Sequence, residues 1–255
     1  MRELVEQLAK GQRLDTKSLS ALLKQCTLDD SLLQFLRDYA VRTARQQFGL
    51  GIYIRGLIEL SSYCRNDCLY CGLRRSNRSA ERYRLTADEV LECCREGYKL
   101  GFRTFVMQGG EDGTHSDAWL EELICRIRSL YPDVAITLSL GERSEESYRR
   151  LKRAGANRYL LRHEAADEGL YASLHPDSRG IRHRLNCIEA LQRAEYQVGM
   201  GMMIGVKGQT TEHIVEDLKL IEQYRPQMVG IGPFLPHHAT PLGNEPKGSL
   251  TLTLA

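Results

Sequence analysis

Short apolar runs alternate with amphipathic stretches along most of this chain. Six runs have the composition of strands, and they lie near residues 52–60, 103–108, 134–140, 158–163, 197–204 and 228–232. Helical periodicity follows at about 86–99, 116–130, 144–154, 182–195 and 211–224. Repeated strand–helix units predict parallel strands joined by right-handed crossovers. The expected fold class is α/β, a partial TIM-type (βα) barrel of about six units.

The first 48 residues lack this alternation and are predicted to be helical. The clearest helix spans 29–48, with an Asp at its start and Gly49 after its end. We therefore expect an N-terminal helical extension over 1–48 and a barrel domain over 49–255.

The first four strands have one polar face each, which is unusual for a barrel interior. Strand residues that share this face include Tyr53, Arg55, Leu57 and Glu59, then Thr104 and Gln108, Thr137 and Ser139, and finally Arg158, Leu160, Arg162 and Glu164. Charged residues are seldom buried without partners. The pattern predicts a chamber for a small anionic substrate. An internal salt-bridge network of Arg158, Arg162 and Glu164 is the alternative.

Three cysteines follow the first predicted strand. Cys64, Cys68 and Cys71 are spaced CxxxCxxC, and Tyr70 precedes the last of them. Three thiolates on one tight loop hold three corners of a cubane iron–sulfur cluster and leave one iron open, whereas structural zinc and electron-transfer clusters need four ligands. Three buried cysteines or an incomplete zinc knuckle are the competing interpretations. A loop at the C-terminal mouth of a barrel strand favours the cluster.

Glycines and a carboxylate end the later strands. Gly109, Gly110 and Glu111 follow the second strand, where a ligand can approach the backbone closely and the carboxylate can contact an ammonium group. Met203 and Ile231 lie in glycine-spaced apolar strands that could hold an adenine ring. Close packing of strands against helices is the alternative explanation for these glycines.

Composition limits the classes of function. The chain has 255 residues, a formal net charge of +2 and no apolar run long enough for a membrane span. Near-neutrality gives no electrostatic case for nucleic acid. Eight cysteines in a chain without a signal-peptide pattern are typical of a reducing compartment, so we expect the cytoplasm.

The cysteine loop resembles that of the radical S-adenosylmethionine (SAM) enzymes. In that family the open iron of a [4Fe–4S] cluster binds SAM, and the reduced cluster cleaves SAM to methionine and a 5′-deoxyadenosyl radical. A closer resemblance, to the HydE-type maturases of [FeFe]-hydrogenase, rests on segments 55–75, 137–142, 158–164, 184–187 and 229–237. Biotin synthase and methylornithine synthase share the cysteine loop.

The resemblance implies roles for particular residues. Glu164 and Arg184 would hold SAM, with Tyr70, Gly109, Gly110, Glu111, Ser139, Met203 and Ile231 along the cofactor. Arg55, Gln108, Arg158 and Arg162 would line the substrate chamber. The implied substrate is a small anionic iron–carbonyl–cyanide complex that carries cysteine. The implied partners are a tyrosine-cleaving radical SAM maturase, a scaffold GTPase and a low-potential electron donor.

Two other functions stay open, and one departure from the family is visible. A radical SAM enzyme for an amino acid, of the methylornithine synthase or biotin synthase type, needs the same cluster. A non-enzymatic iron–sulfur protein would need a fourth ligand, such as Cys93, Cys94 or His163. HydE-like proteins continue for two more βα units beyond residue 255, so we expect an incomplete barrel with weakened maturation activity.

Overall fold

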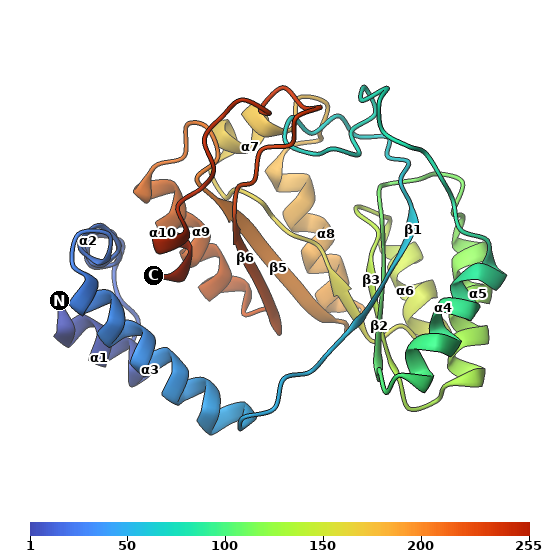
Figure 1. The fold of residues 1–255 in the computed structure, drawn as a ribbon, viewed down its shortest axis with the longest axis horizontal. Coiled ribbons are helices and arrows are strands. Elements are labelled where there is room, and N and C mark those ends of the chain that lie inside the picture. The colour runs from blue at the N-terminus through green and yellow to red at the C-terminus, as the bar shows by residue number, and fades with distance from the viewer.

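The computed structural model describes residues 1–255. Six parallel strands form one sheet in the order β1-β2-β3-β4-β5-β6 (Figure 1). The strands are β1 (Gly56–Ser61), β2 (Thr104–Gly109), β3 (Ala135–Ser139), β4 (Arg158–Leu160), β5 (Gln197–Ile204) and β6 (Met228–Pro233). The helices between them are α4 (Ala87–Lys99), α5 (Asp117–Leu130), α6 (Glu145–Ala154), α7 (Glu168–Leu174), α8 (Ile181–Arg193) and α9 (Thr211–Tyr224). The predicted α/β fold of six strand–helix units is confirmed, and the sheet is a partial barrel whose end strands β1 and β6 are not paired.

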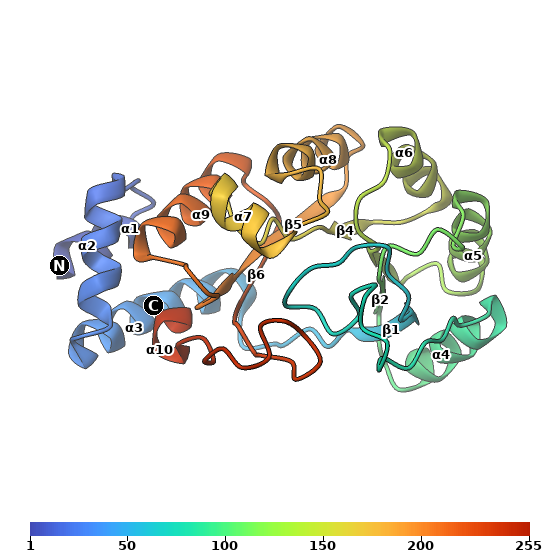
Figure 2. The ribbon, with the colours of Figure 1, turned by 90° about the horizontal axis from the view of Figure 1, so that it is seen from above.

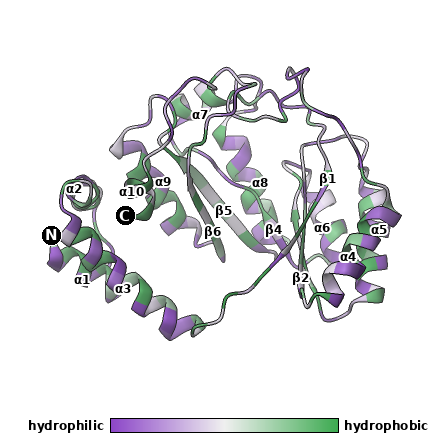
Figure 3. Ribbon diagram, viewed as in Figure 1, coloured by the Kyte–Doolittle hydropathy of each residue, from purple (hydrophilic) through white to green (hydrophobic).

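The apolar face of the sheet forms the main core. Across the strands, Ile58 pairs with Met107, Met107 with Leu138, and Leu138 with Tyr159, so these side chains share one face. All are buried together with apolar residues of α4, α5, α6 and α8. Figure 2 shows these helices in succession around one side of the sheet, and Figure 3 shows their hydrophobic and hydrophilic faces. The opposite face of the sheet carries the polar residues, and it is the face on which a ligand-binding site can form.

Helix ends are set by local chemistry. Thr86 and Glu89 form a capping box at the start of α4, in which each side chain accepts from the other residue's backbone N–H. Asp29 caps α3 (Asp30–Phe48) by accepting from two backbone amides of the first turn, and Gly49 ends that helix with φ 68°.

The N-terminal helices lie on the β5–β6 side of the sheet, next to α9 (Figure 1). α1 (Arg2–Ala9), α2 (Thr16–Cys26) and α3 enclose a small apolar cluster of their own. Leu23 of α2 also packs with Met202 of β5 and with Ile214 and Val215 of α9, close to α10 (Leu250–Leu254). The division into domains at residues 48 and 49 stays a prediction. No helix has the length and apolar character needed to cross a membrane.

Two strand predictions were wrong in extent. The first strand begins at Gly56, not residue 52, because Gly56 pairs with Phe105 near the start of β2 and residues 51–55 have no neighbouring strand. Ile52 and Ile54 in this segment are 89% and 67% exposed. β4 is only three residues long, although the Leu161 and Glu164 backbone N–H groups still donate to carbonyls of β5. The short helix α7 that follows lacks a clear sequence signal.

Candidate active site

An arginine holds the cysteine loop closed on β1. The Arg82 guanidinium donates to the carbonyl of Ser62 at the strand end, and to the carbonyls of Leu73 (3.0 Å), Arg74 (2.8 Å) and Asn77 (3.1 Å). Carbonyls of an irregular loop need donors when they leave solvent. One planar cation thereby fixes both ends of the loop that carries the three cysteines.

A carboxylate fixes the loop from within. Asp67 lies immediately before Cys68 and accepts from Arg74 Nε at 2.8 Å, from Ser76 N at 3.0 Å and from Ser76 Oγ at 2.8 Å. The hydrogen bonds from Arg74 and Ser76 hold the pKa of Asp67 well below its usual value. The loop is therefore organised by its own polar side chains.

The three thiols fit an iron–sulfur cluster chemically. Cys64, Cys68 and Cys71 are free and partly buried. Burial, followed by the charges of Cys71 and Cys64, raises the pKa of Cys68 to about 12, so the Cys68 thiolate needs compensating positive charge, which iron supplies. Cys64 Sγ also accepts the backbone N–H of Glu111 at 3.4 Å. No group of three His, Cys, Asp or Glu side chains converges closely enough to hold a single metal ion.

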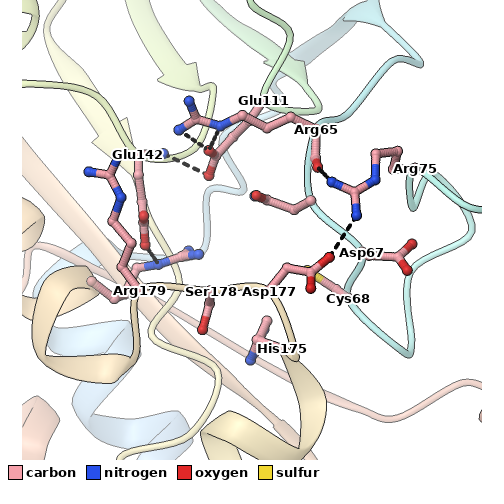
Figure 4. A pocket seen from close by; sticks show the side chains of 12 residues that line it. Arg65, Asp67, Cys68, Arg75, Glu111, Glu142, His175, Asp177, Ser178 and Arg179 are labelled. Atoms are coloured by element: carbon pink, nitrogen blue, oxygen red, sulfur yellow. Dashed lines mark hydrogen bonds and ion pairs between the residues drawn. The ribbon is translucent and has the colours of Figure 1, made fainter.

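A polar cavity of about 300 Å³ adjoins the cysteine loop (Figure 4). Its lining comes from the cysteine loop, the segments after β2 and β3, the segment between α7 and α8, and α8 itself: Arg65, Asn66, Asp67, Cys68, Arg75, Glu111, Glu142, His175, Asp177, Ser178, Arg179 and Arg184. Charged side chains of both signs converge here, which suits a zwitterionic ligand such as an amino-acid group.

Two ion pairs fix the wall between β2 and β3. Arg184 Nε donates to Glu142 Oε1 at 2.7 Å, and Arg65 Nε donates to Glu111 Oε2 at 2.9 Å. Glu111 Oε1 accepts the backbone N–H of Glu142 at 2.9 Å. Glu111 thereby joins the cysteine loop to the segment after β3, and its contact with an ammonium group stays a prediction.

Glu164 is the carboxylate without a full set of partners. It is buried, its Oε1 lies 3.4 Å from Arg162 Nε, and its Oε2 has no hydrogen-bond partner. Burial raises the pKa of Glu164, and the charge of Glu164 is among the causes, after burial, that raise the pKa of Tyr70. A buried acceptor of this kind is satisfied by a cationic or hydroxyl-bearing ligand. Glu164 therefore fits the SAM-holding role predicted for it.

Tyr70 is held in place by a hydrogen bond to His175, which is itself hydrogen-bonded to the backbone of Tyr171. His175 Nδ1 donates to the Tyr171 carbonyl at 2.8 Å, which leaves Nε2 to accept from Tyr70 Oη at 3.0 Å. Burial lowers the pKa of His175 to about 4, so the ring is neutral at physiological pH. This network sets the position of the aromatic residue beside Cys71.

The predicted glycines have different reasons to be glycine. A Cβ on Gly110 would lie 2.2 Å from the Tyr63 carbonyl oxygen and 2.6 Å from Cys64 Cβ, so the cysteine loop itself needs this position. A Cβ on Gly109 would meet Ser61 O at 3.4 Å, an ordinary contact. Gly110 is therefore a packing requirement of the cluster loop.

Sheet register divides the remaining cofactor predictions. Gln108 pairs with Ser139, and both belong to the polar face. Met203 packs in an apolar cluster that includes Tyr171 and contacts Tyr70. Ile231 pairs with Met202, whose side chain is buried in the core on the other side of the sheet from Met203. The side chain of Ile231 thus faces away from the site.

Of the predicted substrate arginines, Arg162 lies apart from Arg158 and Arg55. Arg162 is near the cysteine end, bonded to the Met202 carbonyl and paired with Glu164. Arg158 is at the opposite end of β4, where it donates to Gln197 Oε1 at 2.7 Å and has no carboxylate partner. Arg55 is exposed and lies just before β1. Burial lowers the pKa of Arg158, and the charge of Arg55 lowers it further. A single salt-bridge network of Arg158, Arg162 and Glu164 is not formed.

Several site residues escaped the sequence analysis. Glu142, Arg65 and His175 line the cavity, and the His237 ring lies against Gly72, next to Cys71, where a Cβ would come within 2.8 Å of it. Of these, Glu142 had a detectable signal, a carboxylate directly after the third strand. The others depend on loop conformation.

None of the three suggested fourth ligands joins the cysteine loop. Cys94 is buried in the core on α4, and Cys93 is exposed on the same helix. His163 is fully buried on the core side, 3.2 Å from Asp217. The structure therefore gives no support to complete protein ligation by these residues.

Comparisons with known proteins agree with this geometry. Residues 58–221 match the family model described as "Radical SAM superfamily". The chain is 45% identical over 210 residues to the [FeFe] hydrogenase maturase subunit HydE of Thermotoga maritima, covering 82% of this chain and 60% of that protein. It is 27% identical to the 3-methylornithine synthase of Methanosarcina acetivorans, over 93% of this chain and 67% of the relative.

Solved structures share the fold. The crystal structure of methylornithine synthase (PylB) matches 94% of this chain and 70% of its own with a TM-score of 0.86 and 27% identity. The maturase HydG of Carboxydothermus hydrogenoformans matches 99% of this chain and 62% of its own with a TM-score of 0.82 at 22% identity, a likeness of fold alone. Membership of the matched family implies an iron–sulfur cluster and SAM. The chain belongs to the radical SAM superfamily.

Proposed function

We propose that this chain binds a [4Fe–4S] cluster through Cys64, Cys68 and Cys71 and uses it in radical SAM chemistry. The observation that carries the proposal is the position of the cysteine loop beside a buried carboxylate, Glu164, whose Oε2 has no hydrogen-bond partner. When bound and reduced, such a cluster supplies the electron that cleaves SAM to methionine and a 5′-deoxyadenosyl radical.

The protein's own residues bind and orient. Glu164 accepts hydrogen bonds from the cationic or hydroxyl groups of SAM. Glu142 holds the Arg184 guanidinium, which also donates from Nη1 to the Arg162 carbonyl at 3.1 Å. Tyr70 is fixed by neutral His175. Cys64 receives a backbone hydrogen bond that stabilises thiolate charge.

The first experiment is anaerobic reconstitution with iron and sulfide, followed by electron paramagnetic resonance of the reduced protein with and without SAM. A cubane signal that changes on addition of SAM is expected, because one iron lacks a protein ligand. A spectrum indifferent to SAM would refute the proposal.

Single Cys64→Ala, Cys68→Ala and Cys71→Ala variants should each lose the cubane signal and SAM cleavage while circular dichroism stays that of the folded protein. Cys125→Ala, an exposed cysteine on α5, is the matched control and should retain full iron content. Normal cluster content in any of the three variants would remove that residue from the ligand set.

For the substrate, we propose the HydE type of maturation chemistry, on a small anionic iron–carbonyl–cyanide complex carrying cysteine. The 45% identity to HydE supports it, as does Arg158, a half-buried cation on the polar face with no carboxylate partner. Because the chain spans 60% of that relative's length, the activity of the whole relative is part of the proposal.

An amino-acid substrate, as in methylornithine synthase, is the second candidate and is favoured by the likeness of fold to PylB. The two are distinguished with reconstituted protein, by comparing radical formation and SAM cleavage with each substrate class. Arg158→Gln should spare SAM affinity and impair turnover of an anionic substrate. Unchanged turnover would contradict the assigned role of Arg158.

We further propose partners from the hydrogenase maturation pathway: a tyrosine-cleaving radical SAM maturase, a scaffold GTPase and a low-potential electron donor. Likeness to the maturase HydE supports this assignment. The cytoplasm is proposed as the compartment, supported by eight cysteines that are all free thiols.

A further inference from the structure

The chain makes a strained turn where Glu164 enters the site. Glu164 has φ 68°, and the Ala165 backbone N–H donates to the His163 carbonyl at 2.9 Å across it. A hydrogen bond from residue i+2 to residue i around a central residue of positive φ defines a γ-turn, a rare and strained conformation for a residue with a Cβ. Such strain persists only where the surrounding structure enforces it.

One side chain of α9 brackets this turn on both sides. Asp217 Oδ1 lies 3.2 Å from His163 Nε2 and accepts the backbone N–H of Ala166 at 2.6 Å. These two partners are the residues directly before and after the Glu164–Ala165 pair. The bond from Glu164 N to the Gly201 carbonyl, at 3.0 Å, ties the turn to β5 as well.

Stability alone does not explain the buried contact between His163 and Asp217. Both His163 and Asp217 are fully buried, yet His163 Nδ1 and Asp217 Oδ2 have no hydrogen-bond partner. A buried polar pair that leaves hydrogen-bonding atoms unsatisfied seldom gives the most stable fold. Apolar residues of similar volume can often replace such a pair without loss of stability. A role in function explains their presence better than a role in stability.

We propose that His163 and Asp217 are positioning residues that hold the γ-turn, so that the Glu164 carboxylate, whose Oε2 has no partner, is presented to the amino-acid or ribose groups of SAM. His163 does not contact the ligand, because it lies on the core face, opposite Arg162. The inference rests on the proposed function, since it assigns Glu164 to SAM.

The test is SAM affinity, measured by anaerobic calorimetry on reconstituted, unreduced protein, with iron content and melting temperature recorded for each variant. Asp217→Asn should weaken SAM binding by about tenfold, the lower range for loss of a residue that orients a ligand-binding group. Iron content should not change. Glu216→Gln, which removes an exposed carboxylate from the same helix, is the control and should bind normally.

A double-mutant cycle separates positioning from general destabilisation. In a Glu164→Ala background, Asp217→Asn should cause no further loss of affinity, since the carboxylate that it positions is gone. Where Asp217→Asn does not fold, His163→Gln removes one of the two contacts and is used in the same cycle.

The outcomes are distinct. Normal affinity in the folded Asp217→Asn or His163→Gln variant, or an equal loss with and without Glu164, would overturn this inference and leave the proposed function intact. A wild-type protein with full iron content that does not bind SAM would refute the proposed function and this inference with it.

Discussion

At the scale of single residues, the site depends on side chains placed at a cost in stability. Glu164 combines a positive φ with a buried, partly unpaired carboxylate. A glycine would adopt this backbone without strain, and a residue with a Cβ does not. The strained backbone at Glu164 agrees with the role in SAM binding that we propose for its carboxylate.

Glu164→Gly should raise the stability of the folded protein by about 1 kcal/mol, because it removes backbone strain. The same change should weaken SAM binding. Thermal melts and SAM titrations measure the two effects. Glu195→Gly, at an exposed residue with φ 59°, is the control that relieves comparable strain without a change in SAM affinity. Undiminished SAM affinity in Glu164→Gly would contradict the role of the carboxylate.

At the scale of elements, the cysteine loop has no regular secondary structure and is held by polar side chains. Arg82 joins the end of β1 to the far part of the loop through backbone carbonyls. Ser61 and Arg84 both donate to Asp112 after β2, at 2.7 and 2.6 Å, and so join the ends of the first two strands.

Arg82→Met should lower the iron retained after reconstitution and increase the rate of its loss to a chelator, because the loop carbonyls lose their shared donor. Each hydrogen bond from a charged group contributes about 2 kcal/mol, so the loop should open more often. Arg78→Met, an exposed arginine of the same segment, is the control. Equal iron retention in the two variants would show that the loop does not need the clamp.

Asp112→Asn should destabilise the fold by about 2 kcal/mol at neutral pH, since the Asp112 carboxylate accepts from a cation, a hydroxyl and an amide. The hydrogen bonds from Arg84 and Ser61 outweigh burial and hold the pKa of Asp112 well below its usual value. This stabilisation is present above the unfolded pKa, near about 4, and is lost as pH falls through the lower native pKa.

Urea titrations at several pH values measure that difference. The stability gap between wild type and Asp112→Asn should be widest at neutral pH and should shrink as the solution is acidified below about pH 4. A gap that is independent of pH would contradict the charged state of Asp112.

At the scale of the whole molecule, the sheet is an open arc. The chain passes from α3 to β1 along a segment that lies apart from the helices (Figure 1). Phe48, Leu50, Ile52 and Ile54 in and before this segment are all exposed. Contiguous exposed apolar side chains promote association or dye binding, whereas scattered ones do not.

The 255-residue chain should therefore bind an apolar fluorescent dye, and the double change Ile52→Ser with Ile54→Ser should reduce the fluorescence by about half or more while the melting temperature stays within about 2 °C, because surface substitutions have small effects on stability. Leu28→Ser removes an isolated exposed leucine and should leave dye binding unchanged. Equal fluorescence of wild type and the double variant would show that this segment is not the dye site.

The sequence by itself determined the βα order, most strand and helix boundaries and the cysteine loop, since hydrophobic period, capping residues and thiol spacing are local properties. The tertiary structure decided where β1 begins, because a strand needs a partner at each residue. It alone brought Arg184 to Glu142 and Asp217 to the turn at Glu164, since these pairs join residues 42 and 51 or more positions apart. The side-chain direction of Ile231 and the hydrogen bonds of Glu111 likewise depend on strand register and loop conformation, which a local sequence pattern does not specify.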